Sequence, residues 1–189
     1  MDIEKLYRDK IEGQLQLAIS LLKLEIQNKL EAQGHGKRET SRLINDIETE
    51  VETLAFASIA GLYMQDYYIF LERGVRASNI PFQRGSGRRT SKYIEGLKRF
   101  WRRKGLGPKE SERAAFATAN KHKKEGMPTR ASFGFSKDGT RLSFLSSTIE
   151  SFEERMIEVI TNGVSKDVEI IFNMLFDNTI KSFPFDSSI

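Results

Sequence analysis

Apolar residues recur every three or four positions through the first 35 residues, which is the spacing of one face of an α-helix. The stripe consists of Ile3, Tyr7, Ile11, Leu15, Ala18, Leu22, Ile26 and Leu30. Gly34 and Gly36 follow it, and their backbone freedom opposes a continued helix. The pattern therefore predicts a long N-terminal helix within residues 1–35.

The segment that follows favours strands. A polar stretch at residues 37–50 predicts at most a short helix. Residues 51–63 then carry apolar side chains at alternating positions, which predicts a strand buried on much of both faces. Residues 67–71 form a second strand or a short helical turn, which Gly74 ends. We therefore place strands within residues 51–82.

The middle of the chain, residues 83–131, predicts a basic loop followed by two short helices. Ser91 or Thr90 is a suitable N-cap for the first helix. The apolar stripe of this helix consists of Ile94, Leu97 and Trp101. The boundary signals are Gly105 after the first helix, Pro108 in the first turn of the second, and Gly126 after it.

The last third predicts a hairpin and a second long helix. Asp138-Gly139 is a two-residue turn signal between apolar residues, so we expect a hairpin over residues 132–146. Ser147 and Glu150 have capping-box spacing and open a helix over residues 147–181, which Asn162-Gly163 kinks or splits. Residues 182–189 form a loose tail whose Phe183 and Phe185 require a partner surface.

These elements predict an α+β fold in a single domain, residues 1–189. The long N- and C-terminal helices would pack on a small antiparallel β-sheet, with the two short helices in the basic middle segment.

Charge is unevenly distributed along the chain. The net charge is +4, but Arg84 to Arg130 contain 15 Lys/Arg against 4 Asp/Glu, while the flanks are acidic. Such a pattern indicates contact with phosphates or with acidic protein surfaces. A solvated basic face that pairs with the acidic flanks of a neighbouring copy explains it equally well.

The composition narrows the class of protein. The 189 residues include no cysteine, so disulfides and thiolate zinc sites are excluded and a reducing compartment is expected. No apolar run approaches ~18 residues, and the charged N-terminus is unlike a secretory signal. We expect no membrane association, and a soluble product that stays in the cell or leaves it by lysis.

Candidate chemistry is sparse. The two histidines, His35 and His122, have no carboxylate at metal-ligand spacing, and a solvent-exposed role is expected for each. The Gly-x-Gly of residues 85–87 lacks the rest of a nucleotide-binding motif. The sequence therefore predicts no enzyme activity, no catalytic residue, no cofactor and no metal. A small hydrolase would need a pocket with a perturbed ionisable group, for which the chain offers no candidate.

Basic residues surround the single tryptophan. Trp101 shares a stripe with Ile94 and Leu97, which favours a core position over stacking on a base. We expect the neighbouring cations to form a surface that contacts nucleic acid or an acidic partner. Its candidate residues are Arg84, Arg88, Arg89, Arg99, Arg102, Arg103 and Lys104.

The order of signals between Tyr67 and Phe133 resembles the tail-completion or head–tail connector (neck) proteins of tailed bacteriophages. The shared elements are Tyr68, Phe70, Glu72, Gly74, Pro81-Phe82, Ile94, Trp101, Arg103, Lys104, Gly105, Ala115-Phe116-Ala117, Lys121, Lys123, Gly126, Met127, Pro128 and Phe133. A long closing helix is also shared. Val75 and residues 118–120 depart from the family's pattern.

The resemblance implies a structural virion protein that assembles in the bacterial host cytoplasm. Many copies would form a homo-oligomeric ring that joins portal or adaptor proteins to tail proteins around the DNA passage. Non-specific contact with DNA is left open. The implied interface residues are Glu72, Arg73, Gly74, Pro81, Phe82, Phe183 and Phe185.

Two alternatives remain at this stage. Glu72 and Gly74 either end a strand at a surface used by a neighbouring copy or form an ordinary turn with a solvated Glu72. The chain as a whole is either a connector or a nucleic-acid-binding regulator or packaging accessory that uses Arg84 to Arg130. A steep salt dependence of DNA binding distinguishes the regulator.

Overall fold

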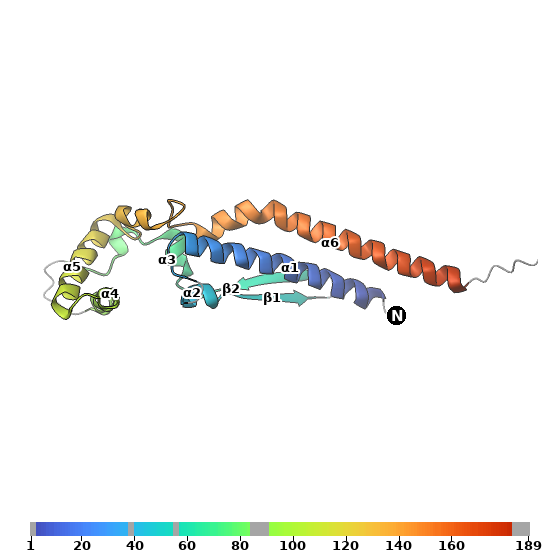
Figure 1. Cartoon of the computed structure of the whole chain (residues 1–189), viewed down its shortest axis with the longest axis horizontal. Coiled ribbons are helices and arrows are strands. Elements are labelled where there is room, and N and C mark those ends of the chain that lie inside the picture. Colours follow the sequence, from blue (N-terminus) through green and yellow to red (C-terminus); the bar gives the residue numbers. More distant parts are fainter. Residues whose placement is uncertain (1–2, 38–39, 55–56, 84–90, 183–189) are drawn as a thin grey trace, which may run out of the picture. The chain divides into compact units, whose positions relative to one another are not determined.

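The structure, a computed structural model, describes residues 3–37, 40–54, 57–83 and 91–182 (Figure 1). It divides into two compact units. The long-helix unit comprises Met1–Leu30, Gly36–Gln65 and Leu145–Ile189, and the short-helix unit comprises Glu31–His35 and Asp66–Phe144. The expected α+β class is confirmed, with long terminal helices and a two-stranded antiparallel sheet. The expectation of a single domain stays a prediction.

The long-helix unit is built around α1 (Ile3–Ala32), which ends just before Gly34 as predicted. Within this unit α1 lies beside α6 (Phe144–Ser182) and the β1–β2 hairpin (Figure 1). The short helix α2 (Arg42–Asn45) packs Leu43 and Ile44 into the core, and Gln27 Nε2 donates to the Ile44 carbonyl at 2.8 Å. The buried apolar residues of the unit are Ala18, Ile19, Leu22, Ile26, Leu30, Leu43, Ile44, Ile47, Phe152 and Ile171.

The predicted strand over residues 51–63 is wrong: two strands, β1 (Glu48–Thr53) and β2 (Ser58–Tyr63), pair antiparallel there. Leu54 N–H donates to the Ala57 carbonyl at 2.7 Å across the turn. The sheet pairs Val51 with Ala60 and Glu52 with Ile59. The apolar alternation continues through the turn, but the turn moves Ile59 to the exposed face.

The short-helix unit confirms most boundary signals. Its elements are α3 (Tyr68–Arg73), the 3₁₀ turn η1 (Ala77–Asn79), α4 (Lys92–Arg103), α5 (Pro108–Glu125) and the 3₁₀ segment η2 (Arg130–Phe135). Ser91 caps α4 through its hydroxyl, which accepts from the Ile94 N–H at 3.2 Å. Gly105 and Gly126 have positive φ at the two helix ends. Residues 67–71 follow the helical alternative, so a strand there is wrong.

The predicted hairpin over residues 132–146 is also wrong, because the described residues there form η2 and a turn without strands. The turn at Asp138-Gly139 exists, and the Asp138 carboxylate accepts from the Thr140 N–H at 3.0 Å. The flanking backbone bonds elsewhere: Lys137 N–H donates to the Ala32 carbonyl at 2.7 Å, and Gln33 Nε2 donates to the Leu142 carbonyl at 2.9 Å. These contacts with the end of α1 replace the cross-strand ladder.

Helix α6 begins at Phe144, so the predicted capping box at Ser147 is wrong. The helix also continues without a break through Asn162-Gly163. Gly163 has a packing role instead, since a Cβ there would overlap the Gln14 side chain of α1. Gln14 Nε2 donates to the buried Asp167 at 3.2 Å, and Lys10 pairs with the same carboxylate at 3.2 Å.

Gly74 ends α3 and lets two backbone segments meet. Its φ of 71° and ψ of −174° suit only glycine. A Cβ would lie 2.5 Å from the Met127 carbonyl oxygen, where Val75 N–H donates at 2.7 Å and Met127 N–H returns a bond of 2.8 Å. The glycine after Glu72-Arg73 therefore serves a close approach within this chain.

None of the described helices combines the length and apolar character that crossing a membrane requires.

Substituting Gly74 tests this close approach. Gly74→Ala should lower the free energy of unfolding by roughly 2–4 kcal/mol, because the side chain meets both backbone strain and the Met127 carbonyl. Gly96→Ala on α4 is the matched control, with open space around its Cβ and a gain of about 0.5–1 kcal/mol expected. Equal denaturant midpoints for the two variants would contradict this role of Gly74.

Candidate interaction surface

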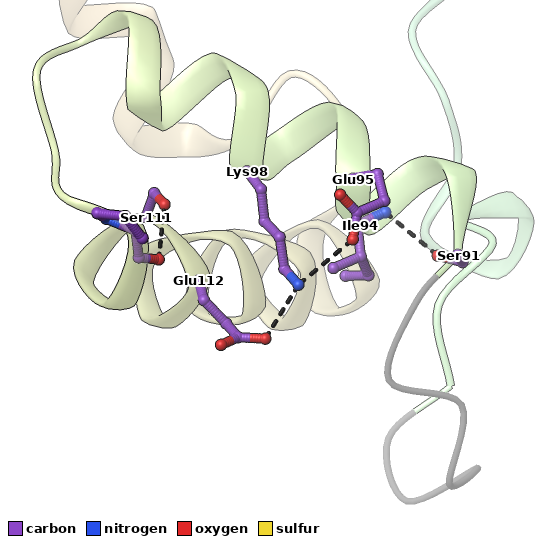
Figure 2. Close-up of polar contacts among 7 residues, drawn as sticks. Ser91, Ile94, Glu95, Lys98, Ser111 and Glu112 are labelled. Atoms are coloured by element: carbon purple, nitrogen blue, oxygen red, sulfur yellow. Dashed lines mark hydrogen bonds and ion pairs between the residues drawn. The ribbon is translucent and has the colours of Figure 1, made fainter.

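The α4–α5 pair is closely packed because α5 presents small side chains to α4. Ser111, Ala115 and Ala119 recur every four residues and are fully buried. From α4, Ile94 is also buried. The Ser111 hydroxyl donates to the Pro108 carbonyl at 2.9 Å (Figure 2). Gly107 N–H donates to the Glu110 carboxylate at 3.1 Å, and the two bonds stabilise the start of α5.

Lys98 lies inside this pair and joins the two helices. Its Nζ is 2.9 Å from Oε1 of Glu112 on α5 and 3.3 Å from Oε1 of Glu95 on α4, and the residue is only 8% exposed (Figure 2). The hydrogen bond to Glu112 raises the pKa of Lys98 above its ordinary value, although burial opposes the shift. Lys98 is therefore a structural cation and is not free for a partner.

Trp101 is a packing residue, as predicted from its stripe. The ring is half-buried, and its Nε1–H donates to the Thr118 hydroxyl of α5 at 3.0 Å. That hydroxyl in turn donates to the Ala114 carbonyl at 2.7 Å. Phe100 lies edge-on to the indole with ring centroids 5.3 Å apart.

The predicted cationic surface exists on the outer side of α4. Arg99, Arg102, Arg103 and Lys104 are all exposed. Lys104 Nζ lies 5.8 Å from the centroid of the Phe100 ring, which is 41% exposed. The other three candidates, Arg84, Arg88 and Arg89, lie outside the described residues. We call Arg99, Arg102 and Arg103 with Lys104 the α4 cationic face.

The predicted interface residues contact different parts of the short-helix unit. Glu72 is half-buried and its carbonyl accepts from the Ser143 N–H at 2.9 Å, while Arg73 is exposed. The Phe82 ring lies 6.3 Å from that of Phe116 on α5. Phe183 and Phe185 lie outside the described residues.

Pro81 and Phe82 line a cavity of about 750 Å³. Among the described residues, its lining also includes Ile80, Gln83, Ser91, Ile94 and Lys123. Lys123 Nζ donates to the carbonyls of Ser78 at 3.3 Å and Ile80 at 3.2 Å, so this exposed lysine ties α5 to the segment that carries Pro81 and Phe82.

Neither histidine is solvent-exposed, which corrects the expectation from sequence. His122 is half-buried, and its Nδ1 shares a hydrogen bond of 2.6 Å with the Tyr93 hydroxyl. Burial lowers the pKa of His122 and raises the pKa of Tyr93 to about 12. Both groups are therefore neutral near pH 7.

His35 belongs to a second polar cluster, formed with Gln33 and Arg141. Arg141 donates to the Ser132 carbonyl at 3.4 Å and the Gly34 carbonyl at 3.5 Å. Burial and the nearby Arg141 charge lower the pKa of His35 to about 4. Gln33 Oε1, His35 Nε2 and Arg141 Nε are buried and have no hydrogen-bond partner among the described residues. Protonation of His35 would place a second positive charge beside Arg141, next to buried polar atoms that have no hydrogen-bond partner in the described part of the chain.

Sequence reasoning missed an acidic face on the hairpin. Glu48, Glu50 and Glu52 all point to the exposed side of β1, opposite Tyr63, Gly61 and Ile59 of β2. The Tyr63 ring covers Gly61, where a Cβ would lie 3.1 Å from the ring. The neighbouring Glu50 raises the pKa of the Tyr63 phenol. The alternation of Glu with Thr and Val in residues 48–53 was the available signal.

Several large apolar side chains of α6 are also exposed. Ile157 is 58% exposed, Val168 45% and Phe172 64%. Positions separated by 11 and 15 residues fall within roughly 60° of each other around a helix, so these three share one face. We call them the α6 apolar stripe.

In the described ranges, no three acidic or histidine side chains are grouped closely enough to hold a metal ion. Searches of protein-family models, curated proteins and solved structures found no match to this chain.

The hydrogen bond between Trp101 and Thr118 can be tested by substitution. Thr118→Val should lower stability by about 1–2 kcal/mol, because the indole N–H loses its acceptor. Thr118→Ser keeps the hydroxyl and should cost less than half as much. Trp101 is the single tryptophan, so its fluorescence during denaturant unfolding reports this helix pair. Equal losses in the two variants would show that the hydroxyl contributes nothing.

The lowered pKa of His35 predicts acid sensitivity. Unfolded His35 binds a proton near pH 6.5, whereas the folded residue does so only near pH 4, so the unfolded state binds more protons between these values. Stability should therefore fall as the pH drops from 6.5 towards 4, by at most about 1.4 kcal/mol per pH unit and less where solvent screens the ring. Urea unfolding midpoints measured between pH 6.5 and pH 4 check this loss of stability. His35→Gln should flatten the dependence, and an unchanged slope in that variant would contradict it.

Proposed function

We propose that this protein is a structural component of a tailed-bacteriophage virion, in which many copies form a ring of the head-to-tail connector. The ring joins portal to tail around the DNA passage. The chain acts by assembly and performs no turnover. The connector role is supported by the resemblance of residues 67–133 to tail-completion and neck proteins, and the assembly role is supported by the surface of the folded chain.

The observation that carries the assembly role is the α6 apolar stripe. Fully burying a side chain such as Ile157 or Val168 is worth about 1.5–3 kcal/mol. Exposed apolar surface that follows one face of a helix is typical of a protein interaction site. A second copy, docked on the stripe, would gain this free energy in each contact, and one head-to-tail contact repeated around a closed rotation generates a ring.

A second candidate function is favoured by the α4 cationic face. A regulator or packaging accessory would place these exposed guanidinium groups against duplex phosphates. Such a protein binds free DNA with an affinity that falls steeply with salt. A connector instead associates with portal or tail proteins and binds free DNA weakly. Measuring DNA binding and neck-protein binding over the same salt series separates the two functions.

The stripe provides a direct test of assembly. Replacing Ile157 and Val168 together by Asp should weaken self-association at least about 100-fold, because two apolar contacts are lost and two charges are desolvated. Light scattering of the purified protein, alone and mixed with virion neck components, measures the mass of the assemblies.

The matched control places the same two charges on another face of α6. Ser151→Asp with Asn162→Asp changes exposed polar positions and should leave the assembled mass as in the wild type. If the wild-type protein is monomeric in every mixture, the proposed function is wrong.

A further inference from the structure

The outer face of the β1–β2 hairpin is exposed within the long-helix unit as far as the structure describes it, and it has a defined chemistry. Glu48, Glu50 and Glu52 occupy alternate positions along β1, so successive Cα atoms of the three are about 6.8 Å apart. Beside them on β2, Ile59 is 53% exposed and Tyr63 is 55% exposed. The face therefore combines a row of three negative charges with two apolar side chains.

The α4 cationic face has the opposite charge and a similar spacing. Arg99 and Arg103 are one helical turn apart, which places their Cα atoms about 6 Å apart along the axis. Arg102 and Lys104 broaden the row, and Phe100 is exposed between them. Lys98 forms ion pairs with Glu95 and Glu112, whereas Arg99, Arg102 and Arg103 form none with the described residues.

We propose that the outer face of the β1–β2 hairpin of one copy docks on the α4 cationic face of a second copy. The contact rests on the proposed function and supplies a further interface between copies, beside the one at the α6 apolar stripe. Arg99 and Arg103 pair with successive glutamates, and such pairs can be bidentate. Tyr63 and Ile59 pack against Phe100, so the charges lie around an apolar centre.

Charge complementarity selects this occupant. Duplex DNA would pair with the α4 cationic face alone and would leave the three glutamates of the hairpin without a partner. A second copy satisfies both surfaces with one contact. The two surfaces differ, so the contact is heterologous: each copy binds one neighbour through its hairpin and the other neighbour through its α4. Such head-to-tail contacts form a ring when the rotation between copies closes.

Charge reversal tests the contact. Variant A carries Glu50→Arg and Glu52→Arg, and variant B carries Arg99→Glu and Arg103→Glu. Each variant alone brings like charges together at every contact, so its self-association should weaken at least 100-fold in light scattering. An equimolar mixture of A and B again pairs opposite charges at both contacts, and association should return.

The controls address folding and net charge. All four positions are exposed, so the unfolding midpoint from Trp101 fluorescence should match that of the wild type. Lys109→Glu with Lys124→Glu changes the net charge of the short-helix unit as variant B does, at exposed sites on α5, and should keep association. Loss of association in this control would attribute the effect to net charge and overturn the inference.

The outcomes separate this inference from the proposed function. If the wild-type chain never associates, both the proposed function and the proposed contact are wrong. If the wild-type chain associates and variants A and B associate equally well, the proposed contact is wrong but the proposed function is not contradicted. If mixing fails but all four substitutions in one chain restore the wild-type mass, the two faces meet within a chain and the inference is wrong. If B loses duplex binding while its assembled mass is unchanged, α4 is a DNA surface and the inference is wrong.

Discussion

The packing of α4 against the small residues of α5 is the contact on which the candidate surface depends. Ser111, Ala115 and Ala119 have no bulk to separate the helices, so α4 lies close enough for Lys98 to reach Glu112 and for Trp101 to reach Thr118. Lys98 and Trp101 therefore bond within the short-helix unit. The same packing leaves Arg99, Arg102 and Arg103 on the outer side, where a partner can reach them.

Local signals in the sequence predicted the local structure of this unit. The Ser91 cap, the left-handed Gly105 and Pro108 at the start of α5 each depend on residues within one turn, so their effects could be read without the rest of the fold. The prediction of a hairpin over residues 132–146 was wrong because of contacts with residues far away in the sequence. The turn at Asp138 has the composition of a hairpin, but Gln33 and Ala32 bond its flanks, and no pattern within residues 132–146 contains that information.

The same distinction applies to the candidate surface. The arginines of α4 could be predicted because they lie off its apolar stripe. The structural role of Lys98 could not be predicted, because only the position of Glu112 on the next helix shows that its charge is already paired. The acidic face of the hairpin was missed because residues 51–63 were assigned to one strand. Placing the turn at residues 54–57 reverses the side on which Ile59 lies and brings it next to the glutamates.

Two surfaces of opposite charge and one apolar stripe are exposed on the described part of the chain, and each lies on a different element. Assembly with further copies is the central claim of this account. Sedimentation velocity of the wild-type chain, over micromolar to millimolar concentrations at low salt, measures it most directly. The account predicts a discrete faster boundary that grows with concentration and dissolves as salt screens the charges. A single 21.6 kDa species at every concentration, with or without virion neck components, would contradict it.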